Sequence, residues 1–185
     1  AVAIGSFALA NQNPDSASST YNTAVGYNAG GAVTTGTENT LIGGLSGDSI
    51  TTATVNTAVG ASSLTANTTG VANTAIGRQA LKSNTTSNFN TAVGAESLVT
   101  NQTGASNTAV GYAALESAAT ANENVAIGVN ALKFATGGSN TAVGEAAGRG
   151  VSGSSSGTNN VALGRNSLYG YTTGSNNVAI GKDTG

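Results

Sequence analysis

A five-residue pattern returns along the whole chain and ends each time in glycine. The pattern reads Asn-Thr/Val-Ala-Val/Ile-Gly, and its closing glycines are Gly5, Gly26, Gly43, Gly60, Gly77, Gly94, Gly111, Gly128, Gly144, Gly164 and Gly181. Seven of the ten intervals between consecutive glycines are 17 residues long. Helical solenoids need about 33 residues or more for each repeat, so this period indicates one coil of a β-solenoid instead.

The composition agrees with an ordered β structure. Charged residues make up 8% of the chain, whereas disordered chains are typically rich in charge and poor in β-branched residues. The Gly, Asn and Thr content of each unit disfavours helix. We therefore predict an all-β fold in which residues 1–185 form a single parallel β-solenoid of about eleven coils, each with two short strands and two turns. At about 4.8 Å for each coil, the rod is on the order of 50 Å long.

Two positions in each unit carry large aliphatic side chains and are predicted to form the core. The residue before the glycine belongs to an aliphatic row, which includes Val59, Ile76, Val93 and Val110. The residue four positions after the glycine belongs to a leucine row, which includes Leu64, Leu81, Leu98 and Leu115, with glycine in its place at Gly30, Gly47 and Gly148. Each buried aliphatic side chain stabilises the fold by about 1.5 to 3 kcal/mol.

The first and last residues of the pattern are predicted to be structural. Asparagines at one phase, including Asn56, Asn73, Asn90 and Asn107, can form a hydrogen-bonded ladder from coil to coil. The glycines, including Gly60, Gly77, Gly94 and Gly111, predict a positive φ or a close backbone approach.

The residue two positions before the glycine is alanine in ten of eleven units, with Leu41 as the exception. Side chains alternate along a strand, so this alanine row is predicted to face away from the aliphatic row and out of the coil. Its constancy suggests a subunit interface at Ala58, Ala75, Ala92 and Ala109, with three solenoids around one axis. The alternative is that alanine recurs only because the unit was duplicated recently.

The pattern also resembles that of a known family. Asn177-Val178-Ala179-Ile180-Gly181 and its copies resemble the haemagglutinin-type head repeats of trimeric autotransporter adhesins, and residues 56–70 and 90–104 resemble repeat arrays of phage tail fibres. The resemblance covers essentially the whole chain. It implies a left-handed parallel β-roll, a homotrimer, and a place in a surface fibre that attaches to host matrix or cells. The adhesin period is usually shorter than the one here, which implies one enlarged turn in each coil or a differently shaped coil. Because the chain starts and ends within the motif, we expect it to be a piece of a longer fibre polypeptide.

The sequence offers little for catalysis. It contains no His and no Cys, which excludes the usual Ser-His, Cys-His and imidazole–metal sites, and its acidic residues are scattered among turns. The net charge of −2 provides no basic patch for nucleic acid, and no apolar run is long enough to span a bilayer. We therefore expect no enzyme activity, no cofactor or metal, no nucleic-acid partner and no membrane insertion by this segment.

Contacts with a receptor are expected at insertions and aromatic residues. Two units are longer than the others, at residues 10–21 and 148–159, and insertions in solenoids become loops that often bind. The predicted surface contacts to a host or cell-surface receptor, with a glycan as one class, are Tyr21, Tyr27, Tyr112, Tyr169 and Tyr171. Asn67, Asn84 and Asn101 begin sequences that match the glycosylation sequon, but turns rich in Asn and Thr create such matches by accident.

These observations favour a structural and adhesive segment of a trimeric fibre that is extracellular, on a cell surface or on a virion. A second hypothesis is an ice-binding solenoid, because Thr23, Thr40, Thr57, Thr74, Thr91, Thr108 and Thr141 form a threonine row three positions before the glycine. That hypothesis requires alanine inside the coil and threonine outside, which is the reverse of the predicted orientation. A third hypothesis is an end-to-end extracellular filament, based only on the apparent lack of caps at the ends.

Overall fold

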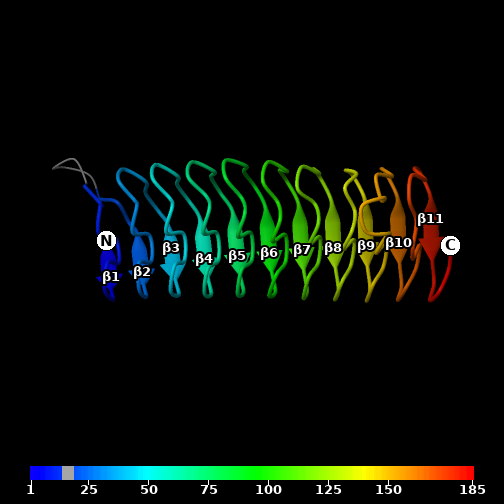
Figure 1. The fold of residues 1–185 in the computed structure, drawn as a ribbon, viewed down its shortest axis with the longest axis horizontal. Coiled ribbons are helices and arrows are strands. Elements are labelled where there is room, and N and C mark those ends of the chain that lie inside the picture. The colour runs from blue at the N-terminus through cyan, green and yellow to red at the C-terminus, as the bar shows by residue number, and fades with distance from the viewer. Residues whose placement is uncertain (14–18) are drawn as a thin grey trace.

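The computed structural model describes residues 1–13 and 19–185 and confirms a β-solenoid. Its strands are parallel and stack in chain order in one sheet, so that the chain advances along the rod one coil at a time (Figure 1). The strands are β1 (Val2–Ile4), β2 (Thr23–Val25), β3 (Thr40–Ile42), β4 (Thr57–Val59), β5 (Thr74–Ile76), β6 (Thr91–Val93), β7 (Thr108–Val110), β8 (Val125–Ile127), β9 (Thr141–Val143), β10 (Val161–Leu163) and β11 (Val178–Ile180).

The register places equivalent residues of neighbouring coils beside one another. Between β4 and β5, Thr57 pairs with Thr74, Ala58 with Ala75 and Val59 with Ile76. Every neighbouring pair of strands follows the same rule, including the pairs that flank the longer units. The 17-residue period is therefore one turn of the chain around the rod.

Each described coil has one short strand, and not the two that were predicted. The cause is the segment after the glycine, where residues such as Ser62 and Leu64 adopt left-handed φ angles of 55° and 52° that a strand does not allow. Backbone hydrogen bonds still join the coils there, for example from Leu64 N–H to the Ala80 carbonyl at 3.0 Å and from Thr68 N–H to the Thr85 carbonyl at 2.8 Å. Turns in this fold therefore pair with the next coil as strands do.

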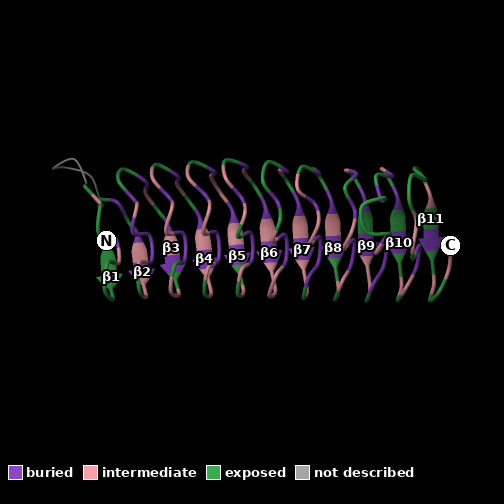
Figure 2. Cartoon of the chain, in the orientation of Figure 1, coloured by how far each residue is buried: buried purple, intermediate pink, exposed green. Residues whose placement is uncertain are grey.

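The core has the opposite orientation to the prediction. The alanine row lies inside the coil, and Ala58, Ala75, Ala92 and Ala109 have no exposed surface. The aliphatic row faces outward along the strands, where residues are half-buried or exposed (Figure 2). The prediction that Val59, Ile76, Val93 and Val110 form the core is therefore wrong, as is the prediction of a subunit interface at the alanine row. The physical reason is the thinness of the coil, because only a small side chain on the strand leaves room for the leucine row opposite.

The leucine row is confirmed as core. Leu64, Leu81, Leu98 and Leu115 are fully buried and pack with the alanines. Their φ angles lie between 50° and 52°, a region that is unfavourable for a side chain of this size. Burial of the leucine therefore offsets a local backbone strain, which explains why glycine is the residue that replaces leucine in this row.

Leu41, the exception in the alanine row, fills the space that two missing leucines leave. A Cβ atom on Gly30 would lie 2.6 Å from Leu41 Cδ1, and one on Gly47 would lie 2.8 Å from Leu41 Cδ2. Val33 and Ile50 add to the same buried cluster. The core thus keeps its volume by moving a large side chain from one wall of the coil to the other.

This exchange predicts a compensating pair of substitutions. We expect Leu41→Ala to lower the free energy of unfolding by about 3 kcal/mol, because the facing glycines cannot fill the cavity. Gly47→Leu alone should also destabilise, since its side chain would collide with Leu41. The double variant should be more stable than the sum of the two losses allows. Urea denaturation of the wild-type chain, the two single variants and the double variant measures this coupling. Strictly additive losses of unfolding free energy would contradict the exchange of core volume between the two rows.

Candidate functional site: the strand face

The outer face of the sheet carries two parallel rows of side chains. The threonine row and the aliphatic row both point outward, and Ile76, Ile127 and Leu163 are 39%, 41% and 45% exposed. None of the eleven strands in residues 1–13 and 19–185 contains a charged residue. At one strand spacing of about 4.8 Å for each coil, this strand face extends for roughly 48 Å. A continuous apolar strip of this length is typical of an interaction surface.

The threonine row offers hydroxyl groups that the described part of the chain leaves free. The threonines of the strands, such as Thr57, Thr74 and Thr91, are half-buried. Within residues 1–13 and 19–185, their hydroxyl groups take part in no side-chain hydrogen bond, whereas the turn residues Thr51 and Thr68 donate theirs to backbone carbonyls of the next coil. The strand face can therefore hydrogen-bond to water or to a partner along its whole threonine row.

The asparagine ladder lies at the start of each strand and is confirmed as structural. Asn73 Nδ2 donates to Asn56 Oδ1 at 3.3 Å and to the Ser87 carbonyl at 2.9 Å, and Asn73 Oδ1 accepts from the Asn90 N–H at 3.0 Å. Asn107 continues the series from Asn90. These side chains are fully buried, so the ladder holds coils together and presents nothing to a ligand.

A second asparagine ladder was missed at the sequence level. Asn84 Nδ2 donates to Asn67 Oδ1 at 3.0 Å, and Asn101 Nδ2 donates to Asn84 Oδ1 at 3.1 Å. All three side chains are fully buried, which makes them inaccessible for glycosylation in the folded chain. Their spacing of 17 residues equals one coil and therefore indicates a stacked row, whereas the match to the sequon indicated glycosylation instead.

The closing glycines lie at the edge of the strand face. They are confirmed as positions with a positive φ and a close approach to the backbone of the next coil. Gly60, Gly77, Gly94 and Gly111 have φ angles between 130° and 135°. A Cβ atom on any of them would lie 2.5 to 2.7 Å from the carbonyl oxygen of the next glycine in the row. The coils therefore stack backbone to backbone at this edge.

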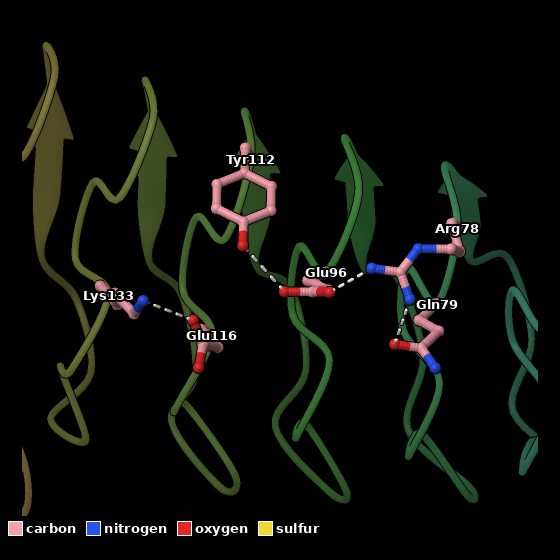
Figure 3. A network of polar contacts seen from close by, with 6 residues as sticks. All are labelled: Arg78, Gln79, Glu96, Tyr112, Glu116 and Lys133. Carbon is pink, nitrogen blue, oxygen red and sulfur yellow. Dashed lines mark hydrogen bonds and ion pairs between the residues drawn. The ribbon is translucent and has the colours of Figure 1, made fainter.

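Charged side chains gather on the turn that follows the glycine. In the described part of the chain every charged residue lies within five positions after a closing glycine, except Glu38 and Glu123. Arg78 pairs with Glu96, which also accepts from the Tyr112 hydroxyl at 3.2 Å, and Lys133 Nζ lies 2.9 Å from Glu116 Oε2 (Figure 3). Each exposed pair contributes about 0.2 to 1 kcal/mol. The pairs link neighbouring coils and leave the strand face uncharged.

The carboxyl groups of this turn show no catalytic arrangement. Burial raises the pKa of the Asp48 carboxyl, although backbone hydrogen bonds and the Asn28 side chain act against the rise. Within the described ranges, no cluster of three or more His, Cys, Asp or Glu residues could bind a metal ion. A search of the same residues finds no helix with the length and apolar character to cross a membrane.

Four of the five tyrosines predicted as surface contacts are exposed, but the structure does not gather them into one site. Tyr21 and Tyr27 lie beside β2, Tyr112 follows β7 and Tyr169 follows β10. Tyr171 does not fit the prediction, because it packs against the core and burial raises the pKa of its hydroxyl to about 12.

The insertion at residues 148–159 packs onto the rod. Ser155 is buried and forms a parallel bridge with Ala135, and the Arg149 guanidinium stacks 5.2 Å from the Phe134 ring and 5.3 Å from the Tyr169 ring. The insertion at residues 10–21 includes residues 14–18 and with them Pro14, which lie outside the described residues.

No protein-family model, no curated protein and no solved structure matches the chain.

Proposed function

We propose that the chain is a structural segment of an adhesive fibre, in which three copies pack around a common axis through their strand faces. One observation carries the proposal. The uncharged strip of aliphatic and threonine side chains runs across all eleven strands and is incompletely buried in the single chain. The strand face takes the interface role that the sequence had assigned to the alanine row.

The repeat of the strip favours another copy of the chain as the partner. A surface with one aliphatic side chain every 4.8 Å or so is matched side chain by side chain only by a surface with the same repeat. A second copy provides this repeat by construction. Covering the half-buried aliphatic residues adds on the order of 1 kcal/mol for each of them, which thickens the otherwise thin core.

The number of copies and the adhesive role rest on the resemblance to trimeric adhesin heads and tail fibres. Three rods with their strand faces toward the axis leave the turns on the outside. Tyr169 then remains available to contact a receptor, with a glycan as one class of ligand. This arrangement suits an extracellular location, a cell surface or a virion.

The proposal predicts that a charge on the strand face dissociates the fibre segment. We expect the chain to be a trimer by size-exclusion chromatography with light scattering, and Ile76→Lys/Val93→Lys to be a folded monomer, because buried lysines have no partner on an uncharged face. The matched control Thr86→Lys/Thr103→Lys adds the same charges on exposed turn residues and should remain a trimer. A monomeric wild-type chain at micromolar concentration would refute the proposal.

Ice binding is the second candidate, because the structure has the orientation that this hypothesis requires. Alanine points inward, and the threonine hydroxyls point outward at strand spacing. The fibre remains the better supported function, since valine interrupts the threonine row at Val2, Val125, Val161 and Val178 and the second row carries no hydroxyls. Thermal hysteresis in the presence of ice separates the two functions, because only an ice-binding solenoid lowers the freezing point without changing the melting point. Absence of hysteresis at millimolar concentration rules out ice binding.

A further inference from the structure

The strand face has two rims, which are formed by residues at the two ends of each strand segment. The N-terminal rim consists of the residues five positions before the closing glycines, and the C-terminal rim of the residues directly after them. Both rims are exposed along most of the rod. In every coil from β2 to β11 the N-terminal rim residue has a left-handed φ, between 52° and 61°.

Large apolar side chains occupy this unfavourable backbone conformation on the N-terminal rim. Val55 has a φ of 60° and is 53% exposed, and Phe89 has a φ of 61° and is 63% exposed. Glycine or asparagine adopts such angles at less cost, and a β-branched residue there is unusual. In the leucine row, burial within the chain offsets such strain. On the N-terminal rim the side chains are exposed, so burial within the chain does not offset it. Strain of this kind is typical of a functional contact.

In the coils from β3 to β7, and again in β9, the two rims carry side chains of opposite size. Where the N-terminal rim has a large residue, the C-terminal rim of the same coil has a small one, as in Val55 with Ala61 and in Phe89 with Ala95.

In the coils between and after these, the sizes are reversed. Ala72 is accompanied by Arg78, and Ser106 by Tyr112. The sizes thus alternate from coil to coil over β4 to β7. Opposite sizes within one coil also occur in β3, with Glu38 and Gly44, and in β9, with Ser139 and Glu145.

Two coils depart from opposite sizes. In β8, Glu123 and Val129 are both large. In β2, Tyr21 and Tyr27 are both large, and Tyr27 packs edge-on against Phe7 of its own chain at 6.0 Å. From β9 to β11 the smaller residue stays on the N-terminal rim, so the alternation from coil to coil ends there.

Contacts within one chain do not explain the opposite phase. Crowding between neighbouring coils accounts for alternation along a single rim, because successive residues are about 4.8 Å apart. The two rims, however, lie at opposite ends of the strand, six residues or roughly 15 to 20 Å apart. A large residue on one rim is therefore too far from the other rim to require a small residue there.

We propose that the two rims meet between copies, with the N-terminal rim of one copy packed in register against the C-terminal rim of its neighbour. The inference rests on the proposed trimer and adds its register and direction. Rotation about an axis parallel to the rod keeps every coil at its height, so Phe89 of one copy meets Ala95 of the next, and Ser106 meets Tyr112. Three such contacts close a ring with all chains parallel.

A shifted register loses this fit. Moving one copy by a single coil in either direction pairs Phe89 with Arg78 or Tyr112, and Ala72 with Ala61 or Ala95. Large residues then collide while small residues leave gaps. One of the two shifts also places Glu123 opposite Glu145, which are like charges. Size and charge therefore both select the unshifted arrangement.

Engineered cysteines test the register directly, because the natural chain has none. We expect Val55→Cys/Ala61→Cys to form a covalent trimer under mild oxidation, seen on a non-reducing gel. The control Val55→Cys/Ala95→Cys separates the two thiols by two coils, or about 10 Å in height, beyond the roughly 7 Å between Cα atoms that a disulfide spans. It should give at most a trace of cross-linked product.

The outcomes separate this inference from the proposed function. Equal cross-linking of the two variants, or none in Val55→Cys/Ala61→Cys while light scattering shows a trimer, overturns the register and leaves the trimer. A monomer in light scattering overturns both. A size exchange provides a second readout. Phe89→Ala should weaken the trimer, and Phe89→Ala/Ala95→Phe should lower the trimer dissociation constant again by at least tenfold. Failure of the exchange to restore the trimer would also overturn the register.

Discussion

Replacing Gly77 by alanine is expected to cost 3 kcal/mol or more of unfolding free energy, roughly the sum of a strained backbone and a steric overlap. The added Cβ would lie 2.5 Å from the Gly94 carbonyl oxygen, and the φ of Gly77 is 135°. Both obstacles are backbone features, so no side-chain movement relieves them. Because each coil is held only by its neighbours, the loss should separate the rod into two weakly coupled halves.

Denaturant unfolding followed by circular dichroism measures the loss for Gly77→Ala. Gly44→Ala is the matched control, because a Cβ there meets no atom within 4 Å and the φ is not in the left-handed range. The control should change stability by less than about 0.5 kcal/mol. Similar stabilities of the two variants would show that the glycine row is not constrained by close packing.

Replacing Asn73 by alanine should cost about 3 kcal/mol, because a buried ladder is interrupted. The substitution removes the two bonds that Asn73 Nδ2 donates and leaves the buried Asn90 N–H without its acceptor. An unsatisfied buried donor is more expensive than the loss of an exposed hydrogen bond. The amide of Asn90 should therefore also lose protection against hydrogen exchange.

Gln102→Ala provides the comparison for Asn73→Ala, since Gln102 is exposed and its side chain makes no hydrogen bond within the described residues. It should be close to neutral in stability. If Asn73→Ala proved equally mild and the Asn90 amide stayed protected, the ladder would contribute little to cohesion between the coils.

The period of the sequence predicted the winding of the chain but not which side of the strand faces inward. Alternation shows that Ala58 and Val59 point to opposite sides, and side-chain size alone predicts that the larger residue is the inner one. The width of the coil decides otherwise, because Leu64 already fills it from the opposite wall. The exceptions held the missing clue, because Leu41 interrupts the alanine row in the same region where Gly30 and Gly47 interrupt the leucine row.

The glycine and asparagine rows were predicted correctly because their chemistry depends on local geometry. A glycine such as Gly77 is required wherever the backbone needs a positive φ and a close contact, whichever side of the strand is inside. The turn conformation was harder to predict, since Leu64 adopts a left-handed φ of 52° that the propensity of leucine opposes. Only the fully formed core explains why a leucine is retained there.

The register of like residues between coils has a consequence for how such a rod changes over generations. Each coil bonds only to the coil before it and the coil after it, through the same atoms at every step. Gain or loss of one 17-residue unit by unequal recombination therefore preserves the backbone ladder at every junction. The length of the rod can be adjusted in increments of about 5 Å, one coil at a time, while this ladder is kept.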